Sequence, residues 1–167
     1  MQSMDNTDDS DGSLVARHAR GDAEAFELLY RRHEMRTWRY LEHNVGNRAT
    51  ADELLQQVWF AVSKDATRFE PKMHFAVWLF AIAYKRLIDS TETNSDPGAA
   101  PAAAPDQVAD LTRAIGQLPR DHREALLLQI EGELSVKEIA SITNSSQETI
   151  RSRLRLARTK LRELLSE

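Results

Sequence analysis

Apolar residues recur every three or four positions along most of this chain, which is the spacing of amphipathic helices. A helix is predicted from Ser13, with Gly21 and Asp22 marking a break or kink in it. A second helix is expected roughly from Glu34 to Asn44, ending near Gly46. The first part of the chain is therefore predicted to be helical.

Two more helices are predicted before the middle of the chain. Thr50 is expected to cap the first of them, because Glu53 three residues later completes a capping box. Residues 68–74, interrupted by Pro71, are predicted to form a loop. The helix expected from Phe75 to about Ser90 is too apolar for a surface position, so it should be central to its domain.

An Ala- and Pro-rich segment then divides the chain. Residues 91–106 lack large apolar groups and are predicted to be a semi-extended linker. The pattern predicts an all-α fold of two small helical domains, at 13–90 and 107–167, preceded by a disordered acidic tail at 1–12.

The second domain begins with two predicted helices. One apolar face recurs from Val108 to Leu118, and Pro119 ends that helix and can open the next. This next helix is expected from Arg120 to Glu131, with Gly132 as its stop.

Two capped helix starts then follow close together. Ser135 with Glu138 fits a capping box, and Ser145 with Glu148 repeats the spacing. Asn144 between them tolerates the left-handed backbone of a tight turn. A short helix, a turn and a longer helix form a helix-turn-helix.

The longer helix carries two stripes side by side. The apolar stripe is Ile150, Leu154, Ala157 and Leu161. The cationic stripe is Arg151, Arg155, Arg158 and Arg162. A helix buried along one side with cations beside it suits a DNA major groove. The alternative is a solvated Arg-rich surface helix, which the preceding capped helix and turn disfavour.

Charge and composition narrow the class of protein. The net charge is −4, yet residues 147–162 hold six cations and one carboxylate. This uneven distribution predicts weak intrinsic DNA affinity that a partner supplements. No apolar run reaches membrane-spanning length and the start of the chain is acidic, so we expect a cytoplasmic protein without membrane contact.

Nothing in the sequence predicts an enzyme, a metal or a cofactor. The chain has no cysteine, and its five histidines lack metal-ligand spacing. Neither a nucleophile elbow nor a Gly-rich phosphate loop is present, so no catalytic residue is proposed.

Four motifs in one order, around the linker, resemble the extracytoplasmic-function sigma factors of the sigma-70 family. They are ADELLQQVW at 51–59, RFEP with FAVWLFAIAYKRLID at 68–89, LPRDHREALLL at 118–128, and EIA with TIRSRLRLAR at 138–158. Each motif alone is weak, but their order is specific, and the resemblance extends over residues 14–165.

The resemblance implies two helical domains that serve RNA polymerase. Region 2 would bind the clamp helices of the beta-prime subunit and open the −10 promoter element. Region 4 would read the −35 element and contact the beta flap. By this resemblance the polymerase-binding residues are Asp52, Glu53, Gln56 and Gln57.

Promoter DNA would meet both regions. Strand opening requires aromatic surface for the bases and cations for the backbone. In region 2 the candidate DNA-binding residues are Lys72, His74, Tyr84, Lys85 and Arg86, while Trp78, Phe80 and Ile82 are read as core. In region 4 the candidates are Gln147, Thr149, Arg151, Ser152, Arg155 and Arg158, with Arg158 either a phosphate contact or solvated.

The chain departs from the family pattern at the polymerase-binding helix. Thr50 and Gln57 stand where carboxylates are common, which should weaken docking on a basic clamp surface. Phosphorylation of Thr50 would restore negative charge at a helix N-terminus. The pattern resembles groups controlled by Ser/Thr kinases, so we expect Thr50 to be a phosphorylation site, with Ser63 or Thr67 as alternatives. The plainer interpretation is that Thr50 is only a cap.

The chain departs from the family pattern a second time after Asp89. The sequence STETN that follows is not basic, which leaves the phosphate contacts of region 2 uncertain.

Two other functions are alternatives to a sigma factor. The stronger is a stand-alone dimeric helix-turn-helix regulator that binds a palindrome. The weaker one is a regulator that binds polymerase or an anti-sigma factor without reading DNA. An anti-sigma factor is also a candidate partner of a sigma factor.

Overall fold

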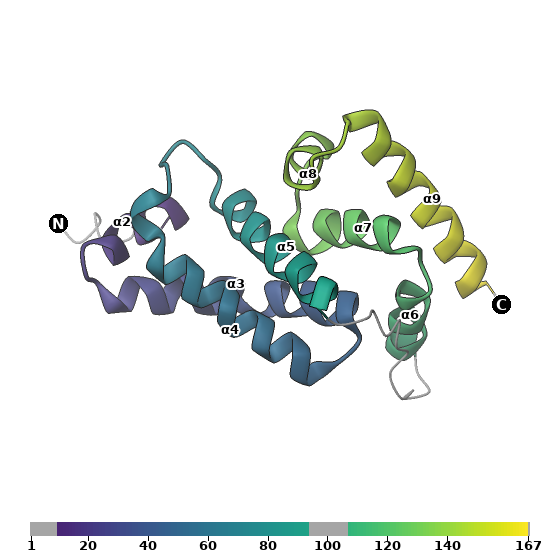
Figure 1. The fold of residues 1–167 in the computed structure, drawn as a ribbon, viewed down its shortest axis with the longest axis horizontal. Helices are drawn as coiled ribbons and strands as arrows, with labels where there is room; N and C mark the ends of the chain where they lie inside the picture. Colours follow the sequence, from purple (N-terminus) through teal and green to yellow (C-terminus); the bar gives the residue numbers. More distant parts are fainter. Residues whose placement is uncertain (1–9, 94–106, 167) are drawn as a thin grey trace.

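The computed structural model describes residues 10–93 and 107–166, and the regular elements in these ranges are helices (Figure 1). They are α2 (Asp11–Ala19), α3 (Ala23–Val45), α4 (Arg48–Lys64), the 3-10 helix η1 (Ala66–Arg68), α5 (Phe75–Thr93), α6 (Gln107–Gly116), α7 (Arg120–Gly132), α8 (Val136–Thr143) and α9 (Gln147–Leu165). The predicted all-α fold is confirmed. Most of the predicted tail and linker lies outside the described residues.

Helix α3 is one continuous helix, so the separate helix predicted at 34–44 is wrong. The break at Gly21 and Asp22 is real, and the Asp22 carboxylate accepts hydrogen bonds from the first amides of α3. Beyond it no proline or glycine interrupts the helix until Gly46, whose φ of 69° ends it. Thr37 and other buried residues recur along one face through the whole length, which is why the helix does not stop at position 34.

Helix α4 begins earlier than the sequence suggested. Asn47, not Thr50, is its N-cap, and its side-chain oxygen accepts the backbone N–H of Thr50 at 3.0 Å. The predicted capping box of Thr50 with Glu53 is therefore wrong. Asn is as good a cap as Thr, and it takes the role because it stands directly after the glycine that ends α3.

Three other boundaries differ from the predictions. Helix α2 starts at Asp11 because Ser10 caps it, two residues before the predicted start. Helix α5 continues through Thr93, into the predicted linker. Gly132 lies inside α7, and the left-handed residue that ends this helix is Glu133, with φ of 55°.

The helix-turn-helix is confirmed, with one shift. Ser135 and Glu138 form the predicted reciprocal capping box of α8. Asn144 adopts the left-handed conformation, with φ of 56°. The cap of α9 is Ser146 rather than Ser145: its hydroxyl accepts the Thr149 amide at 3.0 Å. The Ser145 hydroxyl instead donates to the Thr143 carbonyl.

Helix α5 is central, as its apolar sequence predicted. Its fully buried residues include Leu79, Phe80, Ala83 and Leu87. Trp78 is only partly buried and packs against the rings of Phe69 and Phe75. Within the described residues, no helix is both long and apolar enough to cross a membrane.

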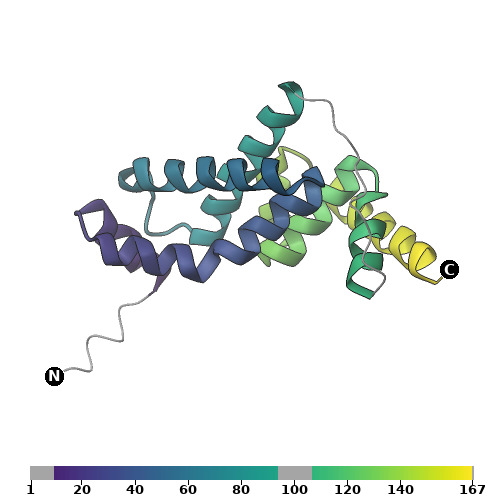
Figure 2. The same cartoon turned by 90° about the horizontal axis from the view of Figure 1, so that it is seen from below.

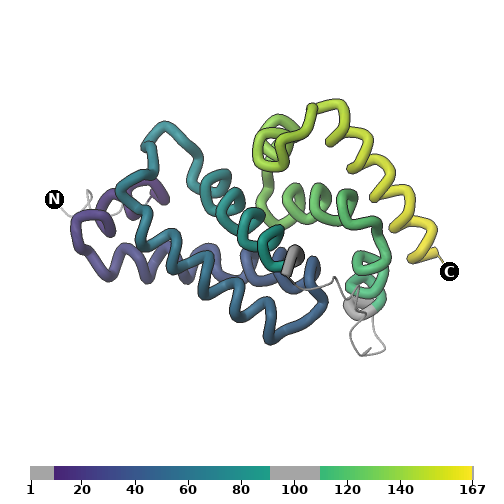
Figure 3. Tube along the Cα trace, viewed as in Figure 1, coloured from purple at the N-terminus to yellow at the C-terminus, as the bar shows by residue number. Residues whose placement is uncertain are grey.

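The two halves of the chain share one apolar core. Helix α7 packs against the C-terminal part of α3, and α8 packs against α5 (Figures 1 and 2). Fully buried Tyr40 of α3 contacts Phe80 of α5 edge to face, with ring centroids 5.4 Å apart. Helix α2 and the end of α9 lie at opposite ends of the molecule (Figure 3).

The side chain of His33 links α3 to α2 through Asp11. His33 is buried, and its Nε2 lies 2.9 Å from the Asp11 carboxylate. Arg36 donates to the Nδ1 atom of His33 at 2.8 Å, and Arg32 donates to Asp11 at 2.8 Å. Partial burial raises the pKa of Asp11, but the hydrogen bonds and charges of His33 and Arg32 outweigh it and hold this pKa below its ordinary value.

The turn residue Asn144 gives a first testable prediction. An alanine there keeps the left-handed backbone only with steric strain, so Asn144→Ala should lower the free energy of unfolding by about 1 kcal/mol. Asn144→Gly is the matched control and should be neutral or stabilising. Chemical unfolding measures the free energy of unfolding of both variants. An equal decrease in the two would contradict the assignment of backbone strain to alanine at position 144.

The Asp11 cluster predicts a pH dependence. A carboxylate with a lowered pKa stabilises the folded state above about pH 4 and loses this effect as the pH falls through its folded pKa. Asp11→Asn should therefore cost about 1 kcal/mol at pH 7 and progressively less below pH 4. Glu27→Gln, which removes an exposed partner of Arg31, should show neither effect. A cost for Asp11→Asn that does not change with pH would contradict the assignment.

Candidate nucleic-acid interface

The recognition helix α9 is buried on one side and cationic beside it. Ile150, Leu154 and Ala157 are buried against the rest of the molecule. Arg151 and Arg155 are exposed. The two stripes predicted from the sequence are therefore real, and the second and third turns of α9 present cations to solvent.

The remaining predicted residues of α9 lie around these cations. Gln147 is exposed and accepts a hydrogen bond from Arg151 at 3.2 Å, which holds both side chains near the start of the helix. Thr149 is partly buried, and its hydroxyl accepts from the Ser146 hydroxyl at 2.8 Å. Ser152 is half-buried. Gln147 and Arg151 are thus free to turn to a ligand, whereas Thr149 has a capping role.

Two other arginines of α9 interact with the body of the protein. Arg153 lies 3.6 Å from the Asp121 carboxylate of α7 and donates to the Ser145 hydroxyl. Arg158 is exposed but donates to the side chain of Gln129 in α7. These contacts fix the angle of α9 on α7, so Arg158 is a weaker candidate for DNA than Arg151 or Arg155.

The predicted DNA residues of the first half form two groups. Lys72 and His74 are exposed in the loop before α5. Lys85 and Arg86 lie just past the middle of α5, where Lys85 is exposed and 3.8 Å from the Asp89 carboxylate. The structure therefore spreads these side chains between the loop and the middle of α5 and does not gather them at one point.

Tyr84 faces the second half of the protein. Its side chain is partly buried among Glu124, Asp121 and Arg120 of α7 and Arg153 of α9. Burial, followed by the charges of Glu124 and Asp121, raises the pKa of the Tyr84 hydroxyl. In this arrangement Tyr84 is partly buried, whereas Lys85 beside it is exposed.

The residues expected to bind polymerase share one face of α4. Asp52, Glu53, Gln56 and Gln57 are all exposed, at spacings that place them along one side of the helix. Phe60 continues this side, with 67% of its surface exposed. We call these five residues the outer face of α4. The first turn of helix α4 contains no carboxylate.

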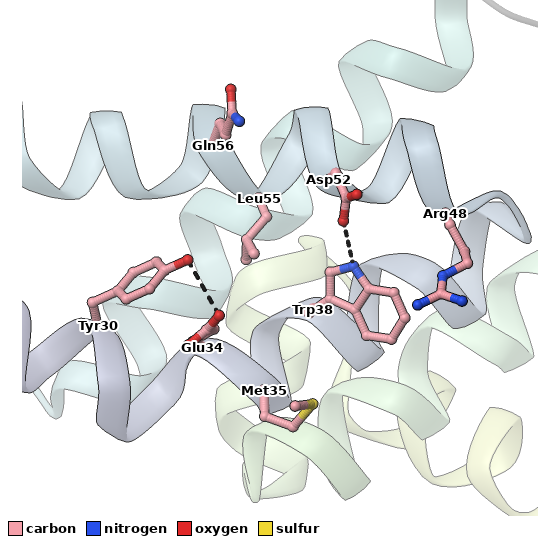
Figure 4. A pocket seen from close by; sticks show the side chains of 8 residues that line it. All are labelled: Tyr30, Glu34, Met35, Trp38, Arg48, Asp52, Leu55 and Gln56. Carbon is pink, nitrogen blue, oxygen red and sulfur yellow. Dashed lines mark hydrogen bonds between the residues drawn. The ribbon is translucent and has the colours of Figure 1, made fainter.

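A groove between α3 and α4 borders this outer face (Figure 4). Trp38 lies in it and donates from Nε1 to Asp52 at 2.9 Å, while the Arg48 guanidinium lies 5.8 Å from the Trp38 ring centroid. Tyr30, Met35 and Leu55 add apolar surface. The groove can take apolar side chains of a partner between an aromatic wall and polar groups.

Sequence reasoning missed Phe60 and left Trp38 unassigned. Phe60 falls outside the apolar stripe of α4, which contains Leu54, Leu55, Val58, Trp59 and Val62. A large apolar residue outside the buried stripe of a helix indicates an exposed contact surface, and this signal was present at Phe60. Trp38 gave no such signal, because its role depends on Asp52 from another helix.

Two family descriptions match the sequence. "Sigma-70 region 2" matches residues 29–95, and "Sigma-70, region 4" matches residues 109–161. The first range holds α4 and α5, and the second holds the helix-turn-helix.

Whole-chain relatives carry the same assignment. The RNA polymerase sigma factor CarQ of Myxococcus xanthus is 35% identical over 88% of this chain and 92% of its own length. The ECF RNA polymerase sigma factor RpoE of Cereibacter sphaeroides is 30% identical over 97% of this chain and 99% of its own length.

A solved structure has a similar fold. It is the sigma factor RpoE in complex with the anti-sigma factor NepR from Bartonella quintana, with a TM-score of 0.71 and 24% identity over 86% of this chain and 98% of that one. The matched regions, the full-length relatives and the helix-turn-helix agree. The chain belongs to the sigma-70 family, as an RNA polymerase sigma factor of the extracytoplasmic-function group.

Proposed function

We propose that this sigma factor binds core RNA polymerase through region 2, opens the −10 element there, and reads the −35 element with α9. The exposed Arg151 and Arg155 on the first turns of α9, beside a buried seam, carry this proposal. They lie where the N-terminal end of a recognition helix meets base edges and phosphates. Such a factor works in the bacterial cytoplasm, where polymerase meets DNA.

The role of region 2 rests on the exposed side chains of Lys72, His74 and Lys85 and on the partly buried Arg86. Lys72 and His74 in the loop, with Lys85 and Arg86 on α5, would follow the DNA backbone. Tyr84, partly buried near the charged residues of α7, would join them through the part of its side chain that is accessible. The non-basic residues after Asp89 leave this backbone contact to the cations already named.

The outer face of α4 is the proposed polymerase site. Two carboxylates, two amides and Phe60 border an aromatic groove. This surface suits the helices of a basic clamp, since anions at the rim steer association and buried aromatic anchors supply affinity.

Control of activity has two candidates. Thr50 stands at the third position of α4, partly exposed, where a phosphate would meet a helix N-terminus that lacks acidic residues. A Ser/Thr kinase would then create the missing charge. An anti-sigma factor is the other candidate, supported by the similar fold of the Bartonella sigma factor solved with one.

Transcription with purified core polymerase tests the function. The protein should start transcripts at a distinct set of promoters, and Arg151→Ala or Arg155→Ala should reduce them about tenfold, since a base or phosphate contact is worth about 1–3 kcal/mol. Arg162→Ala, on the same helix beyond the first turns, is the control and should have little effect. Tight binding of a palindrome by the chain alone, without transcripts, would instead support a dimeric regulator.

Variants of Thr50 test whether its phosphorylation controls polymerase binding. Thr50→Asp should bind core polymerase several-fold more tightly than Thr50→Ala, and the phosphorylated protein more tightly still, because negative charge faces a basic surface. Ser141→Asp adds the same charge at an exposed residue of α8, away from α4, and should leave affinity unchanged. Equal affinities of Thr50→Ala, Thr50→Asp and the phosphorylated protein for core polymerase would contradict control by phosphorylation of Thr50.

A further inference from the structure

The groove between α3 and α4 brings two carboxylates together with two aromatic rings (Figure 4). The Tyr30 hydroxyl donates to the Glu34 carboxylate at 3.3 Å. The indole Nε1 atom of Trp38 donates to the Asp52 carboxylate at 2.9 Å. Each carboxylate is thereby held beside a ring, and each keeps lone pairs that can accept further hydrogen bonds.

Negative charge is concentrated in this groove. Partial burial, followed by the charge and hydrogen bond of Glu34 and the charge of Asp52, raises the pKa of the Tyr30 hydroxyl. One phenol is therefore influenced by two carboxylates from different helices. Among the described residues that line the groove, Arg48 carries the positive charge. The groove thus combines two anions with one cation.

The side chain of Arg48 shows which kind of group this groove accepts. Its guanidinium lies 5.8 Å from the centroid of the Trp38 ring, within the range of a cation–π contact. Arg48 stands four residues before Asp52 on α4, yet in the described part of the chain its guanidinium has this ring contact and no ion pair. The Asp52 carboxylate therefore remains available to another cation.

Arg48 is also free to leave the ring. It is the first residue of α4 and is exposed to solvent. A cation–π contact at an exposed site is weak, because water competes for the cation. A better-placed guanidinium from another protein would therefore displace Arg48 at little cost.

The arrangement around Trp38 favours a guanidinium over an ammonium group. Glu34 precedes Trp38 by four residues, which places the two side chains on one face of α3. Asp52 lies on the other side of the groove and accepts the Trp38 indole N–H. A planar guanidinium can stack on the indole and donate to carboxylates at its edges, whereas an ammonium group is a compact, strongly hydrated charge.

We propose that this groove binds an arginine side chain of core RNA polymerase, which replaces Arg48 on the Trp38 ring and pairs with Glu34 and Asp52. Trp38 is then an anchor of the interface, and Arg48 is an internal competitor that weakens docking. Paired tryptophan and arginine side chains are frequent among the residues that dominate interface affinity. This inference rests on the proposed function, because the groove borders the outer face of α4.

Variants of Trp38 test the stacking contact. Trp38→Leu should weaken binding to core polymerase about tenfold, because the cation loses its aromatic surface. Trp38→Phe keeps a ring but cannot donate to Asp52, so it should lose no more than about threefold. Titration of labelled protein with core polymerase measures the affinities. An equal loss in the two variants would assign the effect to the hydrogen bond and would contradict stacking.

Variants of Arg48 test the competition. Arg48→Ala should bind core polymerase several-fold more tightly, because the ring is then unoccupied. Arg31→Ala removes the same charge from an exposed site on α3 outside the groove, and should gain less than about twofold. In the Trp38→Leu background, Arg48→Ala should gain no more than Arg31→Ala. Equal gains from Arg48→Ala and Arg31→Ala in the natural background would indicate general charge repulsion and would overturn the competition.

A photo-cross-link identifies the group that enters the groove. Met35 lines the groove and has 57% of its surface exposed, so a benzophenone amino acid there faces the bound partner. After irradiation of the full chain with core polymerase, mass spectrometry should locate the attachment beside an arginine of polymerase. An attachment to a segment without arginine would contradict the proposed occupant.

The outcomes separate this inference from the proposed function. Natural protein that does not bind core polymerase in any phosphorylation state would overturn the function itself. Tight binding that neither Trp38→Leu nor Arg48→Ala changes would overturn the arginine site alone. Circular dichroism verifies that each variant is folded. If Trp38→Leu fails to fold, the exposed Arg48 variant and the cross-link still decide the matter.

Discussion

The packing of α7 against α3 and α5 determines the rest of this structure. Through it, the two helical domains share one buried cluster, which includes the contact between Tyr40 and Phe80. Domain contacts within a chain are usually modest and permit relative motion. Here a fitted glycine, an ion pair and an apolar surface make the contact specific, while a buried carboxyl group and an unpartnered hydroxyl limit its strength.

This arrangement divides the working surfaces into two sets. The outer face of α4 and the cations at the start of α9 stay open to solvent. Tyr84 is partly buried, and both α5 and α9 pack against α8. A net charge of −4 adds to the effect, because the chain as a whole does not attract DNA. A sigma factor built in this way would engage its large partner first and promoter DNA afterwards.

Local sequence signals predicted the helices and the family well. The Ser135 capping box, the left-handed Asn144 and the two stripes of α9 are each set by residues within one or two turns, so the sequence could show them. The errors lay in the choice of the capping residue. Asn47 and Ser146 are the caps in place of the predicted Thr50 and Ser145. In each case two residues within three positions of each other have similar capping ability, and the path of the backbone selects one of them.

Long-range features could not be read from the sequence. Nothing in the sequence near Arg39 predicts its ion pair with Glu131, which lies 92 positions away. The groove at Trp38 depends on Asp52 from another helix, and the exposure of Phe60 depends on what packs against α4. The semi-extended linker predicted between the two domains does not indicate how they pack. Their packing is a tertiary property, set by shape and charge across the interface.

The central claim is that the free chain is one compact body. Small-angle X-ray scattering of the unbound, unmodified protein measures this directly. A compact chain of this length has a radius of gyration of about 15 Å, and the account predicts a value close to that, with a single-lobed distance distribution. A two-lobed distribution and a radius well above about 20 Å would contradict it.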